Sequence, residues 1–441
     1  FFLVNHATMF INILRSYLDL PRNIHLLFLL EFFLSLIHVA FILILNIYLR
    51  KQGFSDPEIA SFNSLRFVGA LAFALPLGIF IRGRRLKPFF KMASLMVPLT
   101  SIMIIEAIHY SMTPLIQLSF ILWGIGMMLM RVCSLPFIIR HTTNDNSTEA
   151  LSLSASTWSL STMVSGLIIS GLDWISNIKL SPDLIKLNEY GILWIITLIG
   201  SLSYVFTIQI NEDVDFNKGK RPGIFSLHKT YDWSMIFKAI SPLILISIGA
   251  GLTIPFVNLF FNSVFNFNSS DFSLLSSITA LLVFTFSLLV PTLRKKYGYW
   301  MTIVFVQTLA ILCLVIMSLT EIYASYPYAV IIAVAAYIFR QPLMHMAHPA
   351  SNELMMNYVG KNNQELISAL SSSLWSASWF ISAKLFEWLR LLDFRYYEIF
   401  LITAFLYVLG VILYVFLIKE YENIQKNSAV VLPIADELTI D

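Results

Sequence analysis

The chain has 441 residues, of which 57% are hydrophobic and only 12% are charged, and its mean hydropathy is +0.76. Soluble domains contain about 25% charged residues, so this composition excludes an ordinary soluble protein. The net charge of +3 is too small to indicate a nucleic-acid partner, and we expect the basic residues to anchor membrane-spanning segments instead.

The apolar residues form long continuous runs rather than alternating with polar residues. Such runs are typical of membrane-spanning helices rather than barrel strands, and about 20 residues are enough to cross a bilayer. The sequence therefore predicts an all-α integral membrane protein with twelve transmembrane helices. These helices are expected to begin near Ile24, Pro57, Phe90, Pro114, Ser147, Asn188, Met235, Asp271, Trp300, Tyr326, Gln364 and Tyr396.

The predicted helices fall into two groups of six. We expect a cytoplasmic lead-in over residues 1–23, a first six-helix bundle over 24–210, a cytoplasmic linker over 211–232, a second bundle over 233–418 and a cytoplasmic tail over 419–441. The linker is the longest polar stretch and contains Gly219, Pro222 and Gly223. With the N-terminus inside, 19 Lys and Arg residues lie on the inner side and seven on the outer side, which predicts that both termini are cytoplasmic.

The two groups of helices contain a repeated sequence that runs in the same direction in both. The segment from Asn46 to Ile59 is similar to the segment from Asn258 to Phe272. A repeat of half the chain indicates gene duplication, and in a membrane protein it points to a two-halved transporter with its site between the halves. The matching positions are Asn46 and Asn258, Phe54 and Phe267, Pro136 and Pro349, and Trp158 and Trp375.

Several motifs resemble those of the major facilitator superfamily. From Gly78 the chain reads G-I-F-I-R-G-R-R, which is similar to the family motif Gly-x-x-x-Asp-x-x-Gly-Arg-Arg/Lys between spans 2 and 3. Arg82 stands where the family has Asp, and Arg84 and Arg85 form the basic end. The stretches GAGLTIPFVNLFF (249–261) and FRQPLMHMAHP (339–349) resemble spans 7 and 10 of bacterial members.

The resemblance covers residues 24 to about 420. It implies alternating access by rocking of two six-helix halves, with spans 1, 4, 7 and 10 lining a central cavity and with the loop of Gly78, Arg82, Arg84 and Arg85 acting as a gate. It also implies a multi-pass protein of the bacterial inner membrane.

Charged and polar residues inside the spans are the candidates for transport, because a charge in the membrane is costly. Glu31 and His38 lie on one face of span 1, and Arg131 lies in span 4 at a similar depth to Glu31. An ion pair between Glu31 and Arg131 is one hypothesis. The pair could be a permanent structural bridge or one that opens with substrate or a proton, and a third possibility is that the two residues never meet.

Span 10 has the densest polar face of the chain. Gln341, His345, His348 and Asn352 follow helical spacing, and Arg340 lies beside them. The histidines suit proton coupling, since they titrate near neutral pH, but they could equally hydrogen-bond neighbouring helices. A metal site is a weak third option because no third strong ligand is evident. Secondary candidates in other spans are Arg66, Trp158, Asn258, Asn262 and Trp375.

The deep charges do not balance, because Arg66, Arg131 and Arg340 face one deep acid, Glu31. The sequence therefore predicts a monomeric, proton-coupled secondary transporter for a small anionic or zwitterionic organic solute, with no cofactor and no resident metal. A drug/proton antiporter is the alternative, disfavoured because Gly124 and Gly126 precede Arg131 and because span 5 has no Gly-Pro element. An intramembrane enzyme or a non-transporting sensor is a remote alternative.

Overall fold

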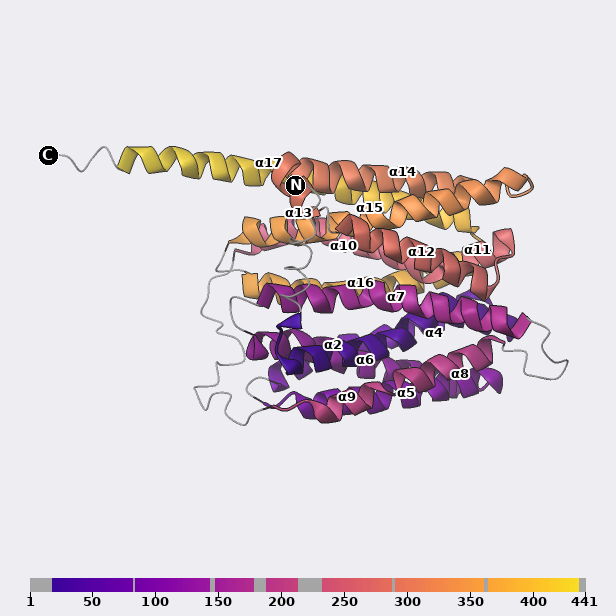
Figure 1. The fold of residues 1–441 in the computed structure, drawn as a ribbon. Coiled ribbons are helices and arrows are strands. Elements are labelled where there is room, and N and C mark those ends of the chain that lie inside the picture. The colour runs from indigo at the N-terminus through magenta and orange to yellow at the C-terminus, as the bar shows by residue number, and fades with distance from the viewer. Residues whose placement is uncertain are drawn as a thin grey trace, which may run out of the picture. The chain divides into compact units, whose positions relative to one another are not determined.

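The computed structural model describes residues 18–81, 84–142, 147–177, 188–212, 232–287, 290–360 and 364–435. These residues form helices and short connections, without a β-strand in the described ranges (Figure 1). Each predicted span coincides with a helix in the predicted order, and the largest difference in a start is in span 9, which was predicted from Trp300 and begins at Lys296. The all-α membrane fold that the hydropathy predicts is confirmed.

The first six spans contain nine helical segments. In span 1 the helices α2 and α3 are joined without a gap by a π-helical turn, η1. Span 6 is divided into two short helices. The segments are α2 (Arg22–Ala40), η1 (Phe41–Leu45), α3 (Asn46–Lys51), α4 (Asp56–Phe80), α5 (Lys87–His109), α6 (Thr113–His141), α7 (Ser147–Asn177), α8 (Glu189–Gly200) and α9 (Ser203–Gln209).

The last six spans are similarly built, with a 3-10 turn, η2, inside span 7 and a π-helical turn, η3, inside span 9. The final helix extends into the predicted tail and ends at Ala435. The segments are α10 (Trp233–Thr253), η2 (Ile254–Phe256), α11 (Val257–Phe265), α12 (Ser269–Ser287), α13 (Val290–Tyr299), η3 (Trp300–Phe305), α14 (Val306–Leu319), α15 (Pro327–Val359), α16 (Gln364–Leu391) and α17 (Tyr396–Ala435). Over the described ranges, nine helices are long and apolar enough to cross a membrane.

The packing defines two compact units. Unit 1 comprises Phe1–Ser226, Pro255–Leu281 and Phe386–Leu391, and unit 2 comprises Leu227–Ile254, Leu282–Leu385 and Leu392–Asp441. The predicted bundles follow the sequence repeat, whereas these units follow contacts. Unit 1 therefore contains α11 and most of α12, which belong to the second repeat in sequence.

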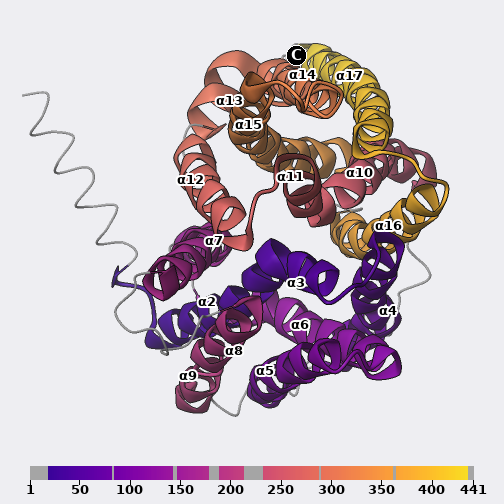
Figure 2. The same cartoon turned by 90° about the vertical axis from the view of Figure 1, so that its right-hand side faces the viewer.

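Small residues let the helices of unit 1 approach closely. In α6, a Cβ atom added to Gly124 would lie 1.9 Å from the backbone oxygen of Arg66 in α4, and one added to Gly126 would lie 2.9 Å from a side-chain carbon of Val97 in α5. Figure 2, viewed along the helices, shows α4, α5 and α6 next to one another. Glycine in α6 thus lets α4 and α5 each come into van der Waals contact with α6, as is common between membrane helices.

Unit 2 uses the same device between α10 and its neighbours. A Cβ atom on Gly249 would lie 2.7 Å from the ring of Tyr407 in α17, and one on Gly251 would lie 2.6 Å from the Cβ atom of Ser382 in α16. The hydroxyl of Ser382 donates a hydrogen bond to the carbonyl of Ile248 at 2.7 Å. These contacts fix α10 against α16 and α17.

Candidate functional site

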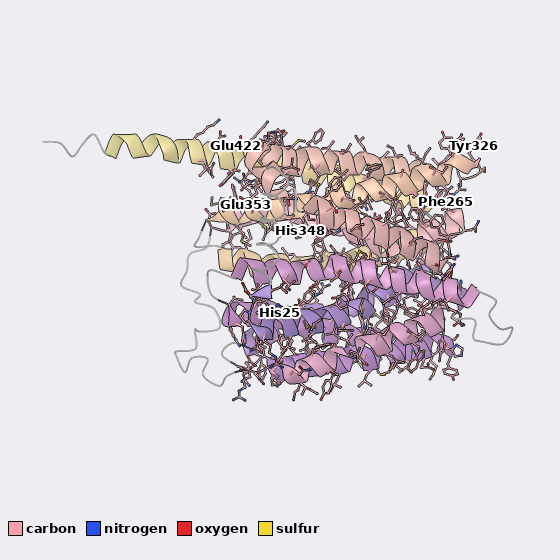
Figure 3. The ribbon with its side chains drawn as sticks, viewed as in Figure 1. His25, Phe265, Tyr326, His348, Glu353 and Glu422 are labelled. Carbon is pink, nitrogen blue, oxygen red and sulfur yellow. The ribbon has the colours of Figure 1, made fainter. Side chains whose placement is uncertain are left out.

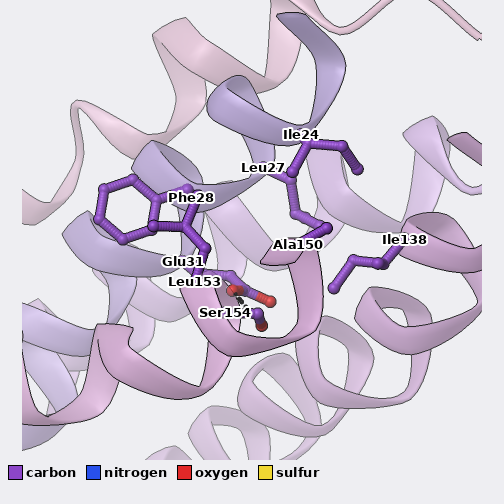
Figure 4. A pocket seen from close by; sticks show the side chains of 8 residues that line it. All are labelled: Ile24, Leu27, Phe28, Glu31, Ile138, Ala150, Leu153 and Ser154. Carbon is purple, nitrogen blue, oxygen red and sulfur yellow. Dashed lines mark hydrogen bonds between the residues drawn. The ribbon is translucent and has the colours of Figure 1, made fainter. Parts of the chain in front are cut away.

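Glu31 lies in α2 at the edge of a narrow recess of unit 1 (Figure 4). Its Oε2 atom accepts a hydrogen bond of 2.7 Å from the hydroxyl of Ser154 in α7. The other side chains of the recess are apolar, so a neutral hydroxyl stabilises this acid. They are Ile24, Leu27, Phe28, Ile138, Ala150 and Leu153.

Glu31 and Arg131, both of which the structure describes, form no ion pair in this conformation. Arg131 lies in the middle of α6 with an exposed side chain, whereas Glu31 is 9% exposed. The hypothesis of a permanent bridge therefore has no support in this conformation.

His38 lies two turns further along the same face of α2, between two tryptophan rings. Its ring stacks on Trp123 of α6, with 5.1 Å between ring centroids and 15° between ring planes. It meets Trp158 of α7 edge-on, at 5.2 Å and 68°. The indole N–H of Trp123 donates to the hydroxyl of Ser101 at 3.0 Å, which fixes the stacked ring. The Nδ1 atom of His38 is buried without a hydrogen-bond partner.

The positive charges of two arginines of unit 1, Arg66 and Arg131, act on His38. Arg66 is 6% exposed, its Nε atom has no partner, and its guanidinium lies 4.8 Å from the centroid of the Phe67 ring. The charges of Arg66 and Arg131 act on each other and on His38. Among the described residues, neither arginine forms an ion pair with a carboxylate. We call His38, Arg66 and Arg131 the basic cluster.

In unit 2 the candidates lie along α15. Arg340 is 1% exposed, donates a hydrogen bond of 3.4 Å from Nη2 to the hydroxyl of Tyr407, and leaves its Nε atom without a partner. Gln341, the next residue, is also buried. Arg340 is therefore buried and is anchored by a neutral group of α17.

The two histidines of α15 are exposed, in contrast to Arg340. His348 meets the ring of Trp375 in α16 edge-on, with 6.2 Å between centroids, and its Nδ1 atom lies 3.4 Å from the Nδ2 atom of Asn352. Figure 3 shows His348 between Tyr326 and Glu353, which lie towards opposite ends of the helix. His345 is one turn away from His348 and also exposed. Neither histidine has a carboxylate partner in the part of the chain that is described.

The loop between α4 and α5, predicted as a gate, is held by residues outside the motif. Gly78 lies in α4, Arg82 lies outside the described residues, and Arg84 and Arg85 are exposed. The backbone N–H groups of Leu86 and Lys87 donate to the carboxylate of Glu212, at 2.7 to 2.9 Å. Arg140 of α6 donates to the carbonyl of Arg84 at 2.7 Å and lies 3.8 Å from Glu212.

Sequence reasoning missed Trp123, Tyr407 and Glu212. Trp123 lies eight residues before Arg131 in the same predicted span, and this nearness along the helix could have identified it. Glu212 caps α5 from 125 residues away in the chain, and no local pattern predicts such a contact. The secondary candidates Asn258 and Asn262 lie in unit 1, where they contact Asn46 and Arg50 at 3.4 and 3.2 Å.

A model of the Major Facilitator Superfamily matches residues 27–383 of the chain. No curated protein matches it by sequence. Three solved structures are similar to the chain and cover most of it. They are a bacterial homologue of the iron transporter ferroportin in its inward-facing state (12% identity, 90% of this chain and 98% of that chain, TM-score 0.69), the inward-open xylose transporter XylE from E. coli (14%, 88% and 94%, 0.67), and a POT family transporter in complex with 5-aminolevulinic acid (12%, 92% and 97%, 0.66).

Proposed function

Since the chain belongs to the Major Facilitator Superfamily, we propose that it is a secondary active transporter for a small anionic or zwitterionic organic solute. It works by alternating access, is coupled to protons, and is a monomer of the bacterial inner membrane with both termini in the cytoplasm. The distribution of Lys and Arg residues supports this orientation. The observation that supports the substrate class is the basic cluster of His38, Arg66 and Arg131.

An arginine in the middle of a membrane helix is disfavoured by about 2.5 to 3.5 kcal/mol on insertion scales. Two such residues that repel each other, with no carboxylate paired to either in the described ranges, raise that cost further. A bound anion would remove the repulsion and accept hydrogen bonds from both guanidinium groups. Trp158, which is half-buried beside His38, offers a surface for the remainder of the solute.

Transport by purified protein in proteoliposomes tests the substrate class. We expect counterflow of labelled carboxylates or amino-acid-like solutes, 5-aminolevulinic acid among the first to be tried, and little exchange of organic cations. Arg131→Ala should reduce the exchange at least about tenfold because it removes a charged hydrogen-bond donor. Arg22→Ala, which changes an exposed arginine at the start of α2, should leave the exchange unchanged. Preference for cationic drugs would contradict this proposal and favour the antiporter alternative.

Glu31 is the candidate for proton coupling in unit 1. Its carboxylate accepts a hydrogen bond from the hydroxyl of Ser154, which can hydrogen-bond either protonation state. Glu31→Gln keeps the shape and the contact with Ser154 but cannot exchange a proton. We expect this variant to retain counterflow and to lose accumulation driven by a proton gradient. Undiminished accumulation by Glu31→Gln would move the coupling role to His345 or His348.

A further inference from the structure

Asparagines at equivalent positions of the repeat exchange hydrogen bonds within unit 1. The Nδ2 atom of Asn46, the first residue of α3, donates to the carbonyl of Pro255 at 2.6 Å. The Nδ2 atom of Asn258, in the first turn of α11, donates to the carbonyl of Leu43 at 3.1 Å. The separation of 212 residues between Asn46 and Asn258 also relates Leu43 to Pro255. The two bonds are therefore copies of each other about a local twofold axis.

Each asparagine satisfies a carbonyl at an irregular turn of the other repeat. Leu43 lies in the π-helical turn η1, where Asn258 also donates to Ile42 at 3.1 Å. Pro255 lies in the 3-10 turn η2. In a regular α-helix the N–H of Leu259 would donate to Pro255, but here it donates to the Oδ1 atom of Asn258 at 2.8 Å, which leaves Pro255 to accept from Asn46.

Neighbouring residues fix the orientation of this pair. Asn63 of α4 donates to the Oδ1 atom of Asn46 at 2.9 Å, so both ends of that buried amide are hydrogen-bonded. One turn further along, Arg50 donates to the Oδ1 atom of Asn262 at 3.2 Å across the same separation of 212 residues. Arg50 and Arg390 both pair with Asp56. The asparagines thus form a neutral, buried layer beneath a charged one.

We infer that Asn46 and Asn258, here called the asparagine clasp, act as positioning residues. They hold η2 and α11 against the first repeat, and they set how often the transporter opens at the end where α3 and α11 lie. The inference rests on the proposed function, because alternating access requires the end to open once in each cycle. When it opens, entering water can replace the lost donors. In the closed state no water is available, so removing an asparagine leaves a carbonyl unsatisfied in that state alone.

The population of the open state can be measured without knowing the substrate. Spin labels at Thr113 and Leu274, which are exposed in α6 and α12, report the separation at this end in a background lacking Cys133 and Cys313. Pulsed electron–electron double resonance on protein in lipid should resolve a short and a long distance between the two labels. We expect Asn46→Leu and Asn258→Leu each to shift the ratio towards the long distance by about fivefold to a hundredfold.

Further variants separate this role from general packing. Asn63→Leu should give a smaller shift in the same direction, because it removes only the donor that orients Asn46. Thr197→Val is the control, since Thr197 is buried and donates only within its own helix, at 2.7 Å to Leu193. If the leucine variants fold and show both distances in the wild-type ratio, the proposed role of the clasp is wrong. The proposed transport function would not be affected by that result. A single distance in every variant would contradict alternating access itself.

Discussion

Arg66→Met is expected to stabilise the protein and at the same time to abolish transport. Arg66 is buried with its Nε atom unpartnered, and Arg131 repels it. Methionine fills a similar volume without the charge, so the free energy of unfolding should increase by up to about 3 kcal/mol. If the solute is an anion held by this guanidinium, counterflow should fall at least about thirtyfold.

Two measurements on the same preparations check this prediction: the melting temperature in detergent and counterflow in proteoliposomes. Arg66→Lys keeps the charge but loses the planar donor set, and should retain part of the transport. Arg22→Met, at an exposed position, should change neither quantity. A lower melting temperature for Arg66→Met would show that the arginine supports the fold, and would remove it from the substrate site.

Gly124→Ala is expected to be severely destabilising, since its added Cβ atom would lie 1.9 Å from the carbonyl oxygen of Arg66. A backbone atom cannot move aside by changing a rotamer, so α4 and α6 would have to separate. We expect a loss of more than about 3 kcal/mol, at the upper end of overpacking effects. The amount of folded protein after heating and size-exclusion chromatography measures this loss.

Other glycines provide a graded series for the same experiment. Gly126→Ala should be milder, because its Cβ atom would meet a side-chain carbon of Val97 at 2.9 Å, and that side chain can adjust. Gly171→Ala has no atom within 4 Å and should be neutral or stabilising by up to about 1 kcal/mol. Equal stability of all three variants would show that α4 and α6 do not depend on the close approach at Gly124.

Hydropathy was sufficient to predict the helices, because the bilayer requires long apolar segments and each segment satisfies its own backbone. The start at Tyr396 was predicted to the residue. The π-helical turn of Phe41–Leu45 was not predicted, since its sequence F-I-L-I-L is as apolar as the helix around it. The carbonyls of Ile42 and Leu43 in this turn accept hydrogen bonds from Asn258, which is far away in the chain.

The sequence identified candidate residues for the site, but it did not show which of them lie next to one another. Depth along a helix suggested Glu31 and Arg131 as partners, yet depth does not determine which way a side chain points around the axis. Glu31 hydrogen-bonds Ser154 of α7, and Arg131 acts on Arg66 and His38. The aromatic contacts of His38 with Trp123 and Trp158 depend on the packing of three helices, which a single sequence does not specify.

The reciprocal bonds of Asn46 and Asn258 have a consequence for how a duplicated chain can arise. A homodimer of a single six-helix repeat would make both bonds with one asparagine codon, because its symmetry supplies the second copy. Every substitution at that codon would then act twice in the dimer. Fusion of the two copies into one chain lets each position change by itself, so an ancestral symmetric contact can become an asymmetric one in single steps.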